Sequence, residues 1–218
     1  MKQKTYKLFI FDFDGTLGDT EECVIASYQQ TFIDNHLPQA SRADIIHSMG
    51  LSLSIALRKL TNNTLEATSY DKLVSDYRTH YRHFLKEKTQ IFPEVKETLQ
   101  TLKSQGKLLS IATSKKTVLA QMSCKFLDIE PYFDLIVGDD MVTKKKPDPE
   151  MLVQTLDALN VDKKDAVIVG DSIFDIQMGN TLGVDTVAVT WGAHSIDMLT
   201  TAKPRYIINR FSELLRFA

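Results

Sequence analysis

The sequence alternates short apolar runs with segments of helical periodicity, and this alternation limits the possible fold more than any other feature. The runs are near-continuous and rich in Val, Ile, Leu or Phe, and they cover residues 7–13, 107–113, 135–138, 166–170 and 186–190. Parallel strands that are buried on both faces have this composition. Because helical segments lie between the later runs, we predict an α/β fold with a doubly wound parallel sheet.

The helical segments of this region cover residues 94–105, 116–127, 149–159 and 173–182. Gly106 and Gly183 each follow the last periodic residue of a segment, which is where glycine commonly ends a helix. Asp148 is a candidate N-cap, with Pro149 at the first helical position.

One interval is too long for this pattern. A crossover helix between parallel strands needs roughly a dozen residues or a few more, whereas the runs at 7–13 and 107–113 lie much further apart. An elaborate crossover packed on the sheet is one explanation. The excess carries apolar residues at helical spacing, however, and is long enough to bury its own core. We therefore predict a helical cap domain at 18–88, inserted into an α/β core formed by 1–17 and 89–218.

Composition narrows the class of protein. Of the 218 residues, 43 % are hydrophobic and 25 % are charged, as in a soluble globular protein. The formal net charge of −2 gives no positive field for nucleic acid or an anionic membrane, and no run has the length of a membrane span. The two cysteines, Cys23 and Cys124, form no CxxC motif and are expected to be free thiols, so we predict a cytoplasmic protein.

Acidic and hydroxyl side chains follow several of the predicted strands. Asp12 and Asp14 end the first run, Thr113 ends the second, and Asp171 follows the run at 166–170. The carboxyl ends of parallel strands form the ligand-binding edge of such sheets. Carboxylates gathered there repel one another unless a cation lies among them, and oxygen ligands without His or Cys suit Mg²⁺. Turn formation by Asp-Gly is the alternative explanation.

Two further patterns also have two explanations each. The lysines at 144–146 could be a solvated charge run, but they precede a helix start, and Lys146 next to Pro147 could point at the acidic cluster. Asp171 and Asp175 lie one helical turn apart, which suits either N-terminal capping or a shared site.

Together these motifs resemble those of the haloacid dehalogenase superfamily of phosphotransferases. DFDGTL from Asp12 is similar to the first motif, Thr113 in IATSK to the second, Lys146 in KKPDP to the third, and GDSIFD ending at Asp175 to the fourth. The order of four motifs along one chain is far more specific than any one of them. The helical insertion is similar to the cap of the phosphoglycolate-phosphatase-like branch.

The resemblance implies a role for each motif residue. Asp12 would attack phosphorus as a covalent nucleophile, and Asp14 would act as general acid and then general base. Thr113 would bind the phosphoryl group and Lys146 would neutralise it. Magnesium would be held by Asp12, by Asp171 and by the main-chain carbonyl of Asp14, and the supporting residues would be Ser114, Asp175 and Gly15.

The expected function is therefore a magnesium-dependent phosphatase, a phosphoric monoester hydrolase resembling phosphoglycolate phosphatases or pyrophosphatases. The small phosphorylated substrate stays open, as does the choice between monomer and homodimer. A β-phosphoglucomutase is the first alternative, but its relatives carry a His where Val24 stands here. A non-catalytic phosphate-responsive binding protein is the second. Arg58, Tyr77, Tyr81, Arg82 and His83 could contact substrate from the cap, or simply be surface and packing residues. Glu94 stands at a position where the family frequently has glycine.

Overall fold

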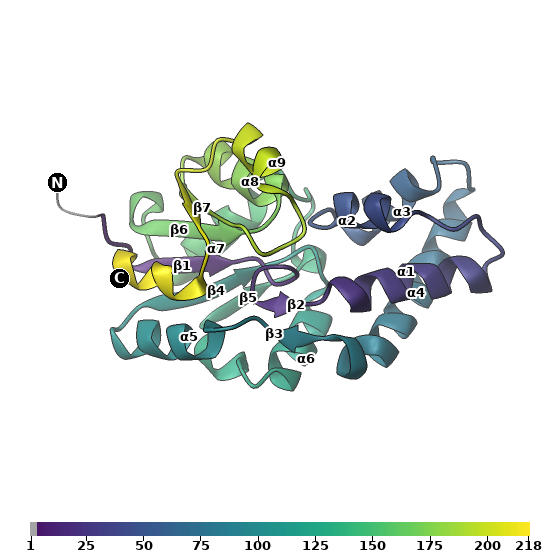
Figure 1. The fold of residues 1–218 in the computed structure, drawn as a ribbon. Helices are drawn as coiled ribbons and strands as arrows, with labels where there is room; N and C mark the ends of the chain where they lie inside the picture. The colour runs from purple at the N-terminus through teal and green to yellow at the C-terminus, as the bar shows by residue number, and fades with distance from the viewer. Residues whose placement is uncertain (1–3) are drawn as a thin grey trace.

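A parallel sheet forms the centre of the computed structural model, which describes residues 4–218 (Figure 1). Within these residues the sheet has six strands in the order β5-β4-β1-β6-β7-β8, and every neighbouring pair is parallel. The strands are β1 (Leu8–Phe11), β4 (Leu108–Ala112), β5 (Leu135–Val137), β6 (Ala166–Gly170), β7 (Asp185–Val189) and β8 (Tyr206–Ile208). The order reverses between β1 and β4 on one side and β6 on the other, as in doubly wound folds. The predicted fold class is confirmed.

Helices cover both faces of the sheet because successive strand residues point to opposite sides. Phe9 and Phe11 of β1 face a core shared with α5, whereas Leu8 and Ile10 face one shared with α7 and α8. All four β1 side chains are fully buried, which explains the continuous apolar run in the sequence. The helices around the sheet are α5 (Val95–Ser104), α6 (Thr117–Phe126), α7 (Glu150–Leu159), α8 (Ile173–Leu182) and α9 (Ile196–Thr201).

A separate helical lobe stands beyond the carboxyl end of the sheet (Figure 1). It consists of α1 (Glu21–Asp34), α2 (Arg42–Ser48), α3 (Leu53–Leu60) and α4 (Ala67–Lys88). Its hydrophobic core is its own and includes Tyr28, Phe32, Leu57, Tyr77 and Tyr81. We call these four helices and their connections the helical lobe.

The chain leaves the sheet for the helical lobe and returns from it at one place. There, β2 (Gly18–Asp19) and β3 (Gln90–Ile91) pair antiparallel, with Gly18 opposite Ile91 and Asp19 opposite Gln90. This two-stranded ribbon joins the lobe to the sheet (Figure 1). β2 lies at the first residues of the predicted insertion, 18–88, whereas β3 lies just after its last residue.

Local details confirm some expectations and correct one. Gly106 and Gly183 follow α5 and α8 with φ of +73° and +78°, the left-handed conformation that favours glycine. The expectation for α7 is wrong by one residue, because Pro149 itself is the N-cap. The Asp148 carboxylate instead accepts a hydrogen bond from the main-chain N–H of Glu150, at 3.1 Å. In residues 4–218 no helix is both long and apolar enough to span a membrane.

Candidate active site

The carboxyl ends of β1, β4 and β6 bring the predicted site residues to one edge of the sheet. Asp12 directly follows β1, Thr113 directly follows β4, and Asp171 directly follows β6. All three are at least 98 % buried. Since β1 lies between β4 and β6, the side chain of Asp12 is central to the group.

Lys146 lies beneath this edge, between two carboxylates. Its Nζ is 3.1 Å from Asp12 Oδ1 and 2.7 Å from Asp175 Oδ1, and its side chain is completely buried. Burial lowers the pKa of the Lys146 ammonium, but attraction to Asp12 and Asp175 outweighs burial and the net shift is upward. Lys146 is therefore a permanent positive charge beside Asp12.

Asp171 is held by one hydrogen-bond donor on each of its two carboxylate oxygens. Its Oδ1 accepts a hydrogen bond from Thr16 Oγ1 at 2.8 Å, and its Oδ2 accepts one from the Ala193 N–H at 2.8 Å. Gly15, with φ of +79°, leaves room for this carboxylate, because a Cβ there would lie 2.1 Å from Asp171 Oδ2. Burial, and then the charge of Asp12, raise the pKa of Asp171 well above its usual value.

The residues present fit a hard divalent cation. Ligand oxygens of Asp12, Asp171 and Asp175 lie within 4.8 Å of one another, and all three residues are buried. Asp12 Oδ1 is buried and faces the Lys146 ammonium at 3.1 Å, with no further hydrogen-bond partner in residues 4–218, and burial is the main cause that raises the pKa of Asp12 to about 7. Such carboxylates are poorly compensated by one lysine, and an oxygen-bound cation would balance them.

Asp175 has less capacity to bind a cation than Asp12 and Asp171. Its Oδ2 accepts hydrogen bonds from the N–H and the hydroxyl of Ser172, and its Oδ1 accepts one from Lys146. Asp175 therefore orients Lys146 and caps α8 at the same time.

The Asp14 carboxylate points away from the acidic group. It lies 2.8 Å from Lys115 Nζ and accepts a hydrogen bond from Thr20 Oγ1 at 2.7 Å. Lys115 in turn lies 3.9 Å from the centre of the Tyr81 ring, a cation–π distance. In the sequence prediction, the main-chain carbonyl of Asp14 binds the metal and its carboxyl group transfers protons. The observed side-chain position, outside the acidic group, suits that division of roles.

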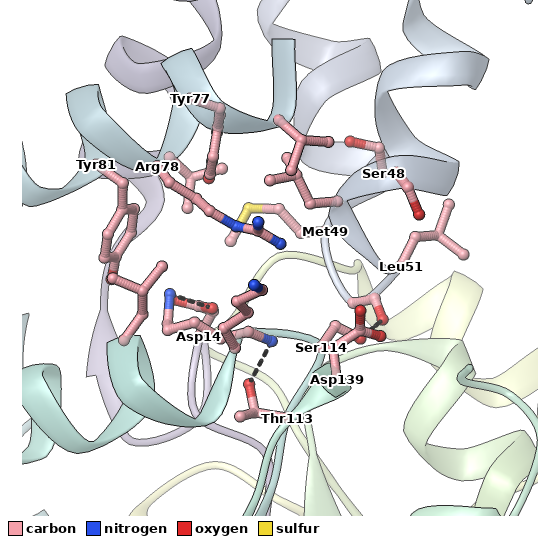
Figure 2. Close-up of a pocket in the computed structure, with 18 of the residues that line it drawn as sticks. Asp14, Ser48, Met49, Leu51, Tyr77, Arg78, Tyr81, Thr113, Ser114 and Asp139 are labelled. Atoms are coloured by element: carbon pink, nitrogen blue, oxygen red, sulfur yellow. Dashed lines mark hydrogen bonds and ion pairs between the residues drawn. The ribbon is translucent and has the colours of Figure 1, made fainter. Parts of the chain in front are cut away.

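A cavity of about 100 Å³ opens above these residues, between the sheet and the helical lobe. Figure 2 shows Thr113, Ser114 and Asp139 on the sheet side, and Tyr77 and Arg78 of α4 on the lobe side. The Ser114 hydroxyl donates a 2.6 Å hydrogen bond to the carbonyl of Gly50, in the connection between α2 and α3. Both parts of the chain thus enclose the space next to Asp12 and Asp14.

Sequence reasoning missed Lys115 and Arg78 as residues of this cavity. Lys115 stands two positions after Thr113, so its place after a strand end was a usable signal. No such signal distinguished Arg78, because many polar residues of α4 occur at the same helical spacing. Of the lobe residues that the sequence proposed, Tyr77 and Tyr81 line the cavity, whereas three others do not: Arg58, Arg82 and His83.

Comparison with known proteins gives concordant matches. The sequence model of the family described as haloacid dehalogenase-like hydrolase matches residues 9–189. The chain is 34 % identical over 210 residues to the probable phosphatase IndB of Dickeya dadantii, covering 95 % of this chain and 91 % of that protein. It is 34 % identical over 218 residues to the pyrophosphatase PpaX of Bacillus pumilus, covering 99 % and 97 %.

Solved structures agree. The crystal structure of a predicted phosphoglycolate phosphatase from Haemophilus somnus matches with a TM-score of 0.90 and 26 % identity, over 97 % of both chains. A haloacid dehalogenase-like hydrolase from Streptococcus pneumoniae matches with a TM-score of 0.83 and 28 % identity, over 99 % of this chain and 98 % of that one. On motifs, fold and similarity together, this chain belongs to the haloacid dehalogenase-like hydrolase family.

Proposed function

We propose that this protein is a magnesium-dependent phosphatase that hydrolyses a small phosphorylated metabolite, either a phosphate monoester or pyrophosphate, through an aspartyl-phosphate on Asp12. One observation carries the proposal. The Asp12 carboxylate is buried beside the ammonium of Lys146 and lines the cavity. A carboxylate that is desolvated but accessible from a cavity is suited to nucleophilic attack.

In the first step an Asp12 oxygen attacks phosphorus, and the bond from phosphorus to the leaving oxygen breaks. Asp14 gives that oxygen its proton, so the product leaves as an alcohol or, from pyrophosphate, as a second phosphate. Thr113 donates a hydrogen bond to the phosphoryl group, and Lys146 balances its charge. Phosphoryl transfer depends mainly on alignment and charge neutralisation, which these residues supply.

In the second step water attacks the phosphorus of the aspartyl-phosphate. Asp14, now a carboxylate, takes the proton from the water, the bond from phosphorus to Asp12 breaks, and inorganic phosphate leaves. Both aspartates return to their starting states. The Thr20 hydroxyl and Lys115 hold Asp14 on the cavity side for both proton transfers.

Asp12 and Asp171 would hold the magnesium, which would supply positive charge beside the nucleophile and the phosphoryl group. Thr16 and the Ala193 N–H orient Asp171 for this purpose. The acidic group of oxygen ligands supports a hard cation, and magnesium is our specific assignment.

The helical lobe would form most of a cap domain, residues 18–88, on a catalytic core of 1–17 and 89–218. The ribbon between β2 and β3 would be its hinge. Closure would remove water from the cavity before the leaving group departs. Its separate hydrophobic core supports movement as one body.

The names of the relatives, a probable phosphatase and a pyrophosphatase, support phosphoryl hydrolysis. The mutase alternative is less well supported, because Val24 lines the cavity at the position of the expected His and cannot transfer a proton. Cytoplasmic location and a monomeric or dimeric state stay predictions; the buried free thiols of Cys23 and Cys124 suit a reducing compartment.

Replacing the nucleophile tests the proposal. Asp12→Asn keeps the size of the side chain and removes its negative charge, so we expect an unchanged thermal unfolding midpoint or a higher one, and loss of at least about 10³-fold in kcat. The control is Asp157→Asn, at an exposed position of α7, which should keep full activity. Activity is measured on phosphate esters with Mg²⁺ and with chelator. Turnover by Asp12→Asn comparable with the parent protein would refute the covalent mechanism.

A further inference from the structure

Six charged side chains of residues 4–218 line the cavity, three of each sign, but there is an imbalance in which of them have a direct partner. Among its lining residues, Lys115 is paired with Asp14 at 2.8 Å, and Asp139 is accompanied by Lys145 at 3.5 Å. Arg78 also lines the cavity, but its guanidinium makes no hydrogen bond or ion pair with any residue in 4–218.

Arg78 extends from α4 into the centre of the cavity in Figure 2, on the side opposite Thr113 and Ser114. Its side chain is half-buried. Burial lowers the pKa of the guanidinium, which still stays charged at neutral pH. The charges of Asp139 and Asp140 favour the guanidinium from a distance, but no described residue gives it a direct ion pair or hydrogen bond to replace the lost water. An anion in the cavity would supply that direct partner.

Lys116 adds to the same imbalance. It directly follows Lys115, lines the cavity, and has no side-chain ion pair or hydrogen bond in the described part of the chain. The phosphoryl group of a substrate is already provided for at the sheet edge, by Lys146 and the proposed magnesium. The positive charge on the lobe side is therefore available for a different group.

We propose that Arg78 determines substrate specificity by binding a second anionic group, a carboxylate or another phosphate, on the leaving-group side of the substrate. This inference rests on the proposed function and names its substrate class: compact phosphorylated compounds that carry two anionic groups. The rest of the lobe wall combines apolar side chains, such as Met49 and Val74, with hydroxyl groups, such as those of Ser48 and Tyr77, and among the described residues Arg78 is its one charged side chain. Arg suits this role because its planar fork binds either oxyanion through two parallel hydrogen bonds.

Matched substrates test the proposal. Phosphoglycolate is compared with its neutral amide, and pyrophosphate with acetyl phosphate, which is also an anhydride but has an uncharged second group. Acetyl phosphate has the better leaving group, so a preference for pyrophosphate would reflect the second anionic group. We expect the parent protein to have at least a tenfold higher kcat/KM on the anionic member of one pair or both. The pair that responds identifies the group as a carboxylate or a phosphate.

The variant is Arg78→Gln, which removes the charge and keeps a polar side chain. We expect kcat/KM on the preferred anionic compound to fall about 10- to 100-fold, the loss typical of one charge-assisted hydrogen bond, and to change less than threefold on its neutral partner. The control is Arg82→Gln, one turn further along α4, exposed and outside the cavity. It should change neither value.

Two results would overturn the inference. One is an equal loss on both members of each pair, since Arg78 would then act on the protein rather than on the second anion. The other is a parent protein that hydrolyses neutral and anionic members equally well, a measurement that needs no variant. Either result leaves the proposed phosphatase function standing, because that function fails only if no phosphate compound is hydrolysed with Mg²⁺.

Discussion

At the scale of single residues, glycines set how closely the main chain approaches the acidic group. A Cβ at Gly192 would lie 2.2 Å from Asp171 Cβ, and a Cβ at Gly170 would lie 2.4 Å from Asp175 Cβ. Gly15 is closer still, at 2.1 Å from a carboxylate oxygen. The carboxylates are therefore fixed by main chain packed against them, which is the arrangement that a preorganised ion site needs.

Gly15→Ala should damage the site more than the fold. Its Cβ must displace the Asp171 carboxylate, so we expect metal affinity and kcat both to fall at least tenfold. The control is Gly106→Ala, which has a similar positive φ of +73° but nothing within 4 Å of the new Cβ. Both variants should lose roughly 1 kcal/mol of stability from backbone strain. Calorimetric Mg²⁺ titration measures the difference, and equal affinities in the two variants would contradict this account.

Glu94 shows what a departure from a family pattern can mean physically. It has φ of +66°, in the left-handed region, at the N-cap of α5. Glycine reaches this conformation without strain, whereas another residue loses about 1–2 kcal/mol. The Glu94 carboxylate accepts a 3.1 Å hydrogen bond from the Ser212 N–H, which offsets part of that cost.

At the scale of elements, the start of α8 belongs to both the fold and the site. Ser172 and Asp175 form a capping box in which the Ser172 hydroxyl donates to Asp175 Oδ2 at 2.6 Å. The other oxygen of Asp175 accepts the hydrogen bond from Lys146. The Asp175 side chain therefore helps to cap the start of α8 and also positions Lys146 beside the nucleophile.

Ser172→Ala should reveal this double role. Losing an N-cap costs about 1 kcal/mol, and the freed Asp175 should hold Lys146 less well, so we expect kcat to fall about three- to tenfold. The control is Ser195→Ala, the N-cap of α9, whose hydroxyl accepts from the Met198 N–H at 3.3 Å. It should lose similar stability and keep its kcat. Denaturant unfolding and steady-state kinetics decide, and equal kcat values in both variants would disprove the link.

The elements themselves were largely predictable from the sequence. Long periodic segments and continuous apolar runs identified β1, β4, β5, β6 and β7 and the helices α5–α8 to within a few residues, and they indicated that the insertion is helical. The short helix α9 was not predicted. Three strands were not predicted from the sequence: β8, with three residues, and β2 and β3, with two residues each. Strands this short show no periodicity. Their pairing depends on the rest of the fold.

The candidate site was predictable only where chemistry coincides with a strand end. Asp12, Thr113 and Asp171 stand at such positions, and topology then brings them together. The role of Arg78 depends on how α4 lies across the sheet edge, which spacing along one helix does not reveal. The Asp14–Lys115 pair likewise becomes visible only in three dimensions.

At the scale of the whole molecule, a tight loop of the helical lobe packs directly against the sheet edge. Gly50 has φ of +90°, and a Cβ there would lie 2.6 Å from Ser172 Oγ and 3.0 Å from Phe174 Cδ2. Its carbonyl accepts the hydrogen bond from Ser114. The enclosed cavity therefore depends on the absence of a side chain at position 50.

Gly50→Ala should hold the lobe away from the sheet. We expect kcat/KM to fall at least tenfold because the reacting groups are misplaced, and small-angle scattering should report a larger radius of gyration. The control is Gly183→Ala, with φ of +78° and only Lys163 Nζ nearby, at 3.7 Å. It carries similar strain far from the loop and should match the parent protein in shape and activity. Unchanged kinetics in Gly50→Ala would show that the loop is not needed for closure.

The ribbon between β2 and β3 has a consequence for how such proteins diversify. Since the outgoing and returning chains are hydrogen-bonded neighbours at Gly18 and Ile91, everything between them is attached at a single point. A segment of another length or sequence could be grafted there without shifting any strand of the sheet. Replacing this segment could therefore change substrate selectivity without changing the residues around Asp12.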